Sequence, residues 1–391
     1  MPSIADYVKY AETSFAAYAV GLANGIGVNA QAFIDANMSP TQAQRFDASW
    51  QVLGQQDIWD GFSAVLLQPV DTQGNPSGQK VLAIRGTEAS HWGIDYLADV
   101  VNITLLGTNA GMRQYASLQD FYLTLIAQGK LGATEEFVVT GHSLGGFLAQ
   151  AFAASHVFAS AAFTFNAPGF SAAPGVIPNF GTELLKLFGL SGTIPNDKIF
   201  NVRALEGLSA TAGLGQMIGS VQTFNIEGSG NPISNHSITT LTDALAVYDV
   251  VARIEPNASL DTIGALVKAS SAKAADTLEA LTGALGKLLL ATPPTIATGD
   301  RDALYRAIAD IRRQLDIGPQ PQRNIVSLTT LSAADLIVAA GNPDAVATRY
   351  ALRELNPFAV LGDDSLYTKF NGNHELDLYS AETGRGLSPQ W

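Results

Sequence analysis

A serine framed by glycines, in the segment VVTGHSLGGFLAQ at residues 138–150, is the residue best placed to do chemistry. The five letters GHSLG match G-x-S-x-G, and they stand between an apolar strand-like run and an apolar helix-like run. A strained turn at this junction needs small residues on both sides of the serine, and Gly141 and Gly145 supply them. Gly146 lets the helix pack close to the strand. The pattern predicts that Ser143 is a nucleophile.

A serine hydroxyl needs a base to take its proton, and the sequence holds five histidines. His236 stands in a loop that leads into a helix after the last predicted strand, where the base of such a site belongs, and His374 is the alternative. His142 is expected to be structural, because the turn directs it aside, while His156 ends the helix behind the serine. His91 comes too early in the chain for the usual order of Ser, acid and His. We therefore predict His236 as the base.

An acidic side chain should orient that base, and four acids lie between the serine and His236. Glu206 follows the strand-like segment KIFNVR at its carboxyl end, where catalytic groups gather in open α/β sheets. Asp197 precedes the same strand, and Glu227 follows the last strand, so they remain the alternatives. Glu183 lies in a leucine-rich helical segment. Glu206 is the predicted acid.

Acyl transfer also needs two donors for the oxyanion of the tetrahedral intermediate. The backbone N–H of Leu144, directly after the serine, is expected to be one of them. The segment VLAIRGTEAS supplies the second, because Gly86 opens the backbone and Thr87 offers both an N–H and a hydroxyl.

The elements that must position these groups alternate between strand and helix patterns from about residue 135 onward, which indicates parallel pairing with helices on both faces. Two earlier strands, separated by turn-forming residues, predict an antiparallel hairpin. The sequence thus predicts an α/β fold with a mostly parallel sheet. Strands are expected at 62–67, 80–85, 135–141, 161–166, 198–203 and 221–226, and helices within 1–50 and at 115–128, 144–156 and 237–252.

The amino-acid composition changes after Pro256, where alanine and leucine become frequent, so we predict two regions. Residues 1–255 would form the catalytic domain with a helical N-terminal segment, and residues 256–391 a mainly helical accessory region. The alanine- and leucine-rich stretch at 258–291 fits a lid, a lipid-docking surface or a core cover, of which a core cover is the most frequent role. A linker at 292–300 and a further helix at 301–315 follow.

Composition excludes several classes of function. A formal net charge of −13 argues against nucleic acid as a partner, because phosphate binding requires Lys and Arg. The absence of cysteine excludes disulfides and thiolate chemistry. Residues 137–182 carry no charge, but glycines and a proline interrupt them, so they do not form a transmembrane helix. The N-terminal residues MPSIADYVKY show no Sec-type signal pattern.

Four segments together, RGTE, IDYLADV, VTGHSLGG and FNAPG, resemble the class 3 lipase group of α/β-hydrolases over roughly residues 60–252. The resemblance implies the α/β-hydrolase fold and hydrolysis of lipid esters, as in a triacylglycerol lipase or a phospholipase A1, at a lipid–water interface. It implies a triad of Ser143, Glu206 and His236, with Thr87 and Leu144 at the oxyanion hole. Asp95 would brace the oxyanion loop. The family usually carries Asp in a D-P or D-x-V setting, where this chain has ALEGLS.

The chain is also similar to the N-terminal lipase part of large bacterial proteins exported by a type I route. This similarity predicts a fragment of a longer secreted protein that lacks a Sec signal, with the cytoplasm as the alternative location. No cofactor is expected to be required, and Ca²⁺ stays open because Asp and Asn are frequent in the loops, although no EF-hand or nonapeptide pattern occurs. The alternative functions are a non-catalytic module of a larger surface or secreted protein, an acyltransferase, or a peptidase.

Overall fold

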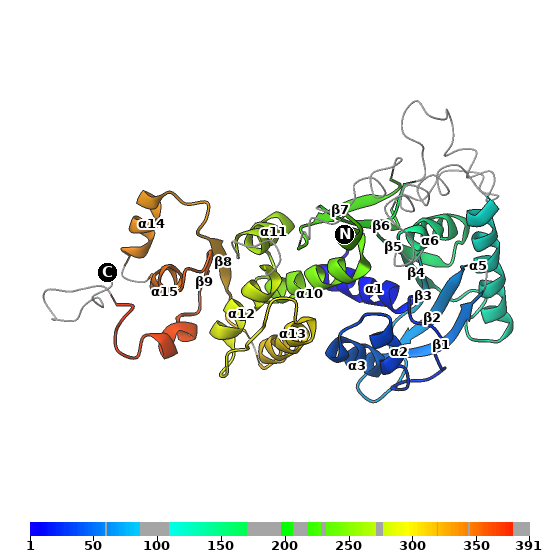
Figure 1. Cartoon of the computed structure of the whole chain (residues 1–391), viewed down its shortest axis with the longest axis horizontal. Helices are drawn as coiled ribbons and strands as arrows, with labels where there is room; N and C mark the ends of the chain where they lie inside the picture. Colours follow the sequence, from blue (N-terminus) through cyan, green and yellow to red (C-terminus); the bar gives the residue numbers. More distant parts are fainter. Residues whose placement is uncertain are drawn as a thin grey trace, which may run out of the picture. The chain divides into compact units, whose positions relative to one another are not determined.

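The computed structural model divides the chain into two compact units, Met1–Leu245 and Ala246–Trp391 (Figure 1). The structure describes residues 1–58, 61–86, 109–169, 197–205, 217–227, 232–270, 277–318, 320–342 and 345–377.

A single mixed sheet forms the centre of the first unit. In the described part of the chain it has seven strands, and their order in space follows their order in the sequence. The first three strands pair antiparallel, whereas the third to the seventh pair parallel. The predicted α/β class, with a mostly parallel sheet entered through an antiparallel hairpin, is confirmed. The strands are β1 (Trp50–Asp57), β2 (Ser63–Pro69), β3 (Lys80–Ile84), β4 (Phe137–His142), β5 (Ala159–Phe165), β6 (Ile199–Ala204) and β7 (Ser220–Phe224).

Strand β1 was not predicted from the sequence, although the helical segment expected up to about residue 50 does end where this strand begins. Its sequence WQVLGQQD is rich in glutamine, and its buried residues are Trp50, Val52 and Gly54. It lies at the edge of the sheet, where it pairs with β2 and makes one isolated bridge to Gly25, and its register with β2 shifts between Val52 and Gly54. An edge strand that is half buried and irregular has too few apolar residues to show a clear alternating pattern.

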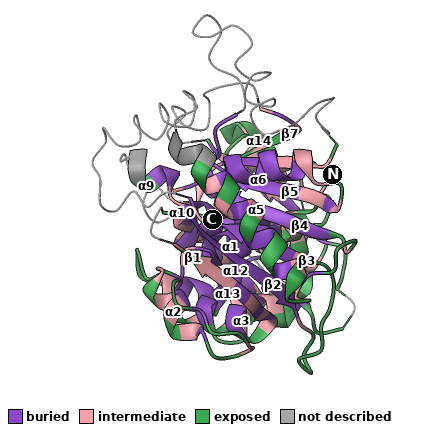
Figure 2. Cartoon of the chain, turned by 90° about the vertical axis from the view of Figure 1, so that its right-hand side faces the viewer, coloured by how far each residue is buried: buried purple, intermediate pink, exposed green. Residues whose placement is uncertain are grey.

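Helices cover both faces of this sheet. On one face lies α1 (Ile4–Ala16), where the ring of Tyr10 stacks on Phe163 with the centroids 4.1 Å apart. Because neighbouring strand residues point to opposite faces, Ala162 joins the apolar core on the other side. There α5 (Asn109–Ala127) and α6 (Leu144–Ser155) contribute Leu118 and Phe152 to the same core. The central strands and α6 are among the buried elements in Figure 2.

Among the described residues, four further helices belong to or begin in the first unit. The last of them, α10, continues past Leu245 into the second unit. They are α2 (Ala30–Asp35), α3 (Pro40–Ser49), α9 (Pro232–His236) and α10 (Ile238–Ile254).

The second unit is mainly helical, but it also holds an antiparallel pair of strands. The sequence did not predict these strands, because each is only four residues long, and such short runs carry little periodicity. None of the described helices in either unit is long and apolar enough to span a bilayer. The remaining elements are α11 (Leu260–Ala269), α12 (Thr277–Leu289), α13 (Arg301–Leu315), β8 (Asn324–Ser327), α14 (Ala333–Ala340), α15 (Val346–Glu354), β9 (Phe358–Leu361) and the 3-10 helix η2 (Asp364–Phe370).

Candidate active site

Ser143 occupies a strained turn between β4 and α6. Its backbone has φ 55° and ψ −124°, a conformation that side-chain-bearing residues rarely adopt. The turn is tight, because a Cβ added to Gly141 would lie 2.3 Å from the backbone of Gly145, and one on Gly145 would lie 2.3 Å from the carbonyl oxygen of Ile84. A Cβ on Gly146 would lie 2.7 Å from the Cβ of Ala167. The glycines therefore allow a fold around Ser143 that other residues would obstruct.

His236 meets the serine at this turn. Its Nε2 lies 3.0 Å from Ser143 Oγ, although the two residues are 93 positions apart in the sequence. Both residues are only 4% exposed. Burial, followed by the proximity of His142, lowers the pKa of His236 to about 3, so the free imidazole is neutral near pH 7. A neutral ring whose Nε2 faces a hydroxyl can accept the proton of that hydroxyl.

His142 lies beside this pair and contacts the backbone of His236. Its Nε2 is 2.7 Å from the carbonyl oxygen of His236, and its Nδ1 is 2.7 Å from the hydroxyl of Tyr18. Burial lowers the pKa of His142 to about 4, which keeps the ring neutral. A carbonyl oxygen only accepts, so Nε2 carries the proton, and Nδ1 accepts a hydrogen bond from Tyr18.

Asn166 makes a second contact to the same carbonyl. It follows β5 with φ 46°, and its Nδ2 donates to the carbonyl oxygen of His236 at 3.0 Å. Its Oδ1 accepts from the backbone N–H of Ala204 at 2.9 Å, and its own N–H donates to Val202. Asn166 therefore links the ends of β5 and β6 to the histidine that faces Ser143.

The predicted oxyanion segment runs directly beside this group. Leu144 is the first residue of α6, and it is buried. A Cβ on Gly86 would lie 2.3 Å from the carbonyl oxygen of His142, 2.7 Å from the Tyr18 hydroxyl and 3.1 Å from the Cβ of Ser143. The chain at residue 86 thus passes close to Ser143 where only glycine fits. Thr87, Asp95 and His91 lie outside the described residues.

The three candidate acids have different outcomes. Glu206 lies outside the described residues. Asp197 is exposed in the turn before β6, at the amino end of the parallel strands, whereas Ser143 stands at their carboxyl end. Asp197 is therefore on the wrong edge of the sheet. Glu227 follows β7 at the carboxyl edge and is half buried.

Two further histidines are accounted for by other contacts. His156 ends α6, at the opposite end of that helix from Ser143, and its ring stacks on Phe152 with a centroid separation of 3.7 Å. His374 belongs to the second unit, where its Nδ1 lies 2.6 Å from Asp377 Oδ2.

Sequence reasoning did not single out Tyr18 or Asn166. Tyr18 carries no local signal, because its contact with His142 joins residues 124 positions apart. Asn166 does stand out as a polar residue at the end of the apolar strand AAFTF, where a buried amide must find partners. That signal could have identified it.

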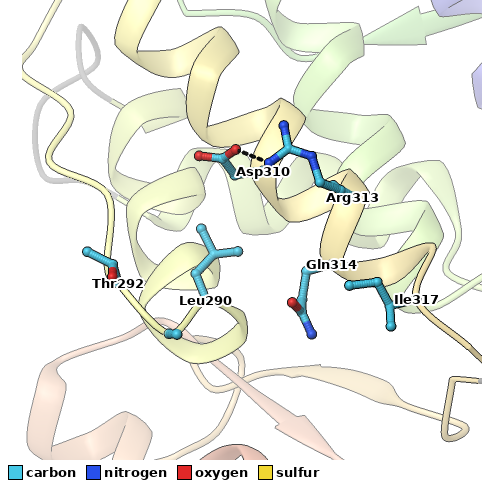
Figure 3. A pocket seen from close by; sticks show the side chains of 7 residues that line it. Leu290, Thr292, Asp310, Arg313, Gln314 and Ile317 are labelled. Atoms are coloured by element: carbon cyan, nitrogen blue, oxygen red, sulfur yellow. Dashed lines mark hydrogen bonds and ion pairs between the residues drawn. The ribbon is translucent and has the colours of Figure 1, made fainter.

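Other parts of the described chain were searched for metal sites and pockets. Among the described residues, no group of three or more His, Asp or Glu side chains is arranged to hold a metal ion. A shallow, open hollow of about 280 Å³ lies in the second unit beside α13 (Figure 3). Its charged lining residues, Asp310 and Arg313, pair with each other at 3.0 Å and are largely exposed.

Comparisons with known proteins add little to this geometry. No protein-family model matches the chain, and no curated protein matches it. Among solved structures, the crystal structure of M37 lipase aligns with 78% of this chain and 81% of its own, at 12% identity and a TM-score of 0.30. The α/β assignment therefore rests on the sheet itself and not on this weak similarity.

Proposed function

We propose that the protein is a serine ester hydrolase of the α/β-hydrolase type that acts on lipid esters. The observation that carries the proposal is the buried Ser143–His236 pair, 3.0 Å apart, on a strained turn between a strand and a helix. Triacylglycerols and phospholipids are the proposed substrates, because the sequence segments around Ser143 resemble those of class 3 lipases. Membership of that group is part of the proposal.

The proposed reaction proceeds through an acyl-enzyme. His236 Nε2 takes the proton of Ser143 Oγ as the oxygen attacks the ester carbonyl carbon. The tetrahedral intermediate collapses when the imidazolium gives that proton to the leaving alcohol, and the acyl group stays on the serine oxygen. Water then attacks the acyl carbon while His236 takes a proton from it, and the carboxylic acid leaves as Ser143 regains its hydrogen.

The N-terminus of α6 supports the charge that develops in this reaction. The backbone N–H of Leu144, at the first position of the helix, is the proposed first oxyanion donor, and the helix dipole favours negative charge there. Thr87 is proposed as the second donor, because the chain at Gly86 already passes beside the Cβ of Ser143. Glu206 is the proposed acid, with Glu227 as the alternative at the same edge of the sheet.

The proposed chemistry uses only groups of the chain itself, so we propose that no cofactor is required, and Ca²⁺ would act only as an optional structural ligand. Dialysis against EDTA should leave the rate of p-nitrophenyl butyrate hydrolysis within about twofold. A complete loss that CaCl₂ restores would show that the proposal lacks an essential cation.

The proposal is tested by labelling with a fluorophosphonate probe and by ester turnover. Wild-type protein should be labelled at Ser143, and Ser143→Ala should abolish both labelling and turnover, a loss on the order of 10⁴-fold or more. Ser155→Ala is the matched control, because Ser155 stands at the other end of α6 with its hydroxyl bonded to backbone carbonyls. Retained labelling of Ser143→Ala would overturn the assignment, and an unlabelled wild-type protein would favour a non-catalytic module.

The substrate class needs a separate measurement. Turnover of a triacylglycerol emulsion, of phosphatidylcholine vesicles and of a soluble p-nitrophenyl ester should be compared at equal ester concentration. Hydrolysis confined to the soluble ester would contradict the lipid assignment while leaving the serine mechanism intact.

A further inference from the structure

The backbone carbonyl of His236 is held by two side chains, neither of which takes part in the proposed proton transfer. His142 Nε2 approaches its oxygen at 2.7 Å, and Asn166 Nδ2 approaches it at 3.0 Å. All three residues are at least 95% buried. A carbonyl oxygen has two lone pairs, so these two donors satisfy it completely.

We propose that His142 and Asn166 are positioning residues that clamp the base His236 onto Ser143 through its main chain. This inference rests on the proposed function, in which His236 must meet the serine hydroxyl at hydrogen-bond distance. His236 is the last residue of a five-residue helix, which by itself holds its backbone weakly. The clamp supplies the rigidity that a short helix lacks.

Asn166 couples the base to the rest of the site. While its amide nitrogen binds His236, its amide oxygen binds the N–H of Ala204 at the end of β6. One planar group therefore sets the distance between the base and the carboxyl end of the neighbouring strand. Its left-handed backbone, with φ 46°, is a conformation that asparagine tolerates better than most residues.

A neutral His142 suits this position better than a charged one. Its ring centroid lies 5.0 Å from that of His236, so a positive charge on His142 would oppose the imidazolium that forms during the reaction. Tyr18 fixes the required tautomer, because its hydroxyl donates to Nδ1 and leaves the proton on Nε2. The hydrogen bonds thus all run in one direction: Tyr18 donates to His142, and His142 donates to the carbonyl of His236.

The experiment measures the second-order rate of fluorophosphonate inactivation together with thermal unfolding. Asn166→Ala and His142→Phe should slow inactivation by about 10- to 100-fold, since small misplacements of a catalytic group have effects of this size. Label should still reach one per chain at Ser143 with time. His142→Gln, whose amide nitrogen can reach the carbonyl, should recover most of the rate that His142→Phe loses.

Asn201→Ala provides the matched control. Asn201 is an equally buried asparagine on β6, and its side chain also donates to backbone carbonyls, those of Ile218 and Ser220. This variant should lower the melting temperature about as much as Asn166→Ala while leaving the inactivation rate within about twofold. An equal loss of rate in both variants, or a wild-type rate in Asn166→Ala, would overturn the clamp.

A second measurement uses the unaltered protein and does not depend on activity. Long-range ¹H–¹⁵N spectra of histidine-labelled protein should show His142 as the neutral Nε2–H tautomer at pH 7, and Tyr18→Phe should shift its Nδ1 resonance. The neutral Nδ1–H tautomer would overturn the clamp, because Nε2 would then have no proton to donate to the carbonyl. Absence of fluorophosphonate labelling in the wild type would instead overturn the proposed function, whereas labelling that is indifferent to Asn166 would overturn the clamp alone.

Discussion

Each unit of the molecule buries a polar network, and the two networks differ in what their protons can do. In the second unit, the side chain of Arg349 is 2% exposed and donates to three backbone carbonyls. Arginine stays protonated at every pH the protein meets, so this network is fixed. The carbonyls are those of Ala340, Asn342 and Leu376.

The network in the first unit is also largely buried, but its chemistry differs. The imidazole of His236 faces the hydroxyl of Ser143, its backbone carbonyl accepts from His142 and Asn166, and the phenol of Tyr18 donates to His142. The imidazole of His236 faces a hydroxyl and can exchange a proton with it, whereas Arg349 donates to backbone carbonyls, which cannot take its proton. Burial of polar groups therefore does not by itself distinguish an active site from a structural hydrogen-bond network. A proton that can be exchanged between two of the groups does distinguish them.

The largest expected effect concerns Glu206, the proposed acid that would orient His236. Glu206→Gln should lower kcat by about 10³- to 10⁴-fold, because a neutral amide no longer stabilises the imidazolium and permits the wrong tautomer of the base. Glu227→Gln is the matched variant and should leave kcat within about twofold. Steady-state kinetics on a p-nitrophenyl ester decide between them, and the reverse outcome would transfer the role to Glu227.

A smaller effect, on stability, is expected from a substitution of Arg349 in the second unit. Arg349→Met removes the donors from the two buried carbonyls of Ala340 and Leu376, so the free energy of unfolding should fall by roughly 2 kcal/mol or more, at about 1–3 kcal/mol for each unsatisfied group. Urea unfolding of the full chain measures this. The exposed Arg313→Met should stay within about 0.5 kcal/mol. If Arg349→Met slows fluorophosphonate labelling of Ser143 while the chain remains folded, the network around Arg349 is not purely structural.

The smallest effect is the pH dependence of stability that His142 imposes. Burial lowers its pKa from 6.5 to about 4, so between these values the unfolded chain binds more protons than the folded one. The free energy of unfolding should therefore fall as pH decreases from 6.5 toward 4, by at most about 1.4 kcal/mol per pH unit from this group. Urea unfolding of His142→Gln should show a shallower slope, and Asn201→Ala should keep the wild-type slope. An unchanged slope in His142→Gln would contradict the assignment.

Much of this fold could be predicted from the sequence, because strands β2 to β5 are short apolar runs that end at or within two residues of glycine, proline or asparagine. Strand β1 could not be predicted, because its many glutamines obscure the alternation of apolar and polar residues. The strands β8 and β9 could not be predicted either, because each has only four residues. Ser143 and His236 could be named from local patterns. The clamp could not, because Tyr18, His142 and Asn166 reach their partners only when the sheet brings distant segments together.

The position of each candidate residue relative to the two edges of the sheet could be predicted from the sequence. In a parallel sheet every strand that points the same way ends at the same edge, so Ser143, Asn166 and Glu227 share it while Asp197 does not. Which side chains meet within that edge depends on loop conformations, and spacing along the chain does not encode those.

The positive φ of Ser143 has a consequence for the stability of the fold. A side-chain-bearing residue in such a conformation costs the fold about 1–3 kcal/mol, and glycine would relieve that strain. We expect Ser143→Gly to raise the melting temperature while it removes the hydroxyl. The residue that the proposed reaction needs is therefore one whose replacement would make the fold more stable.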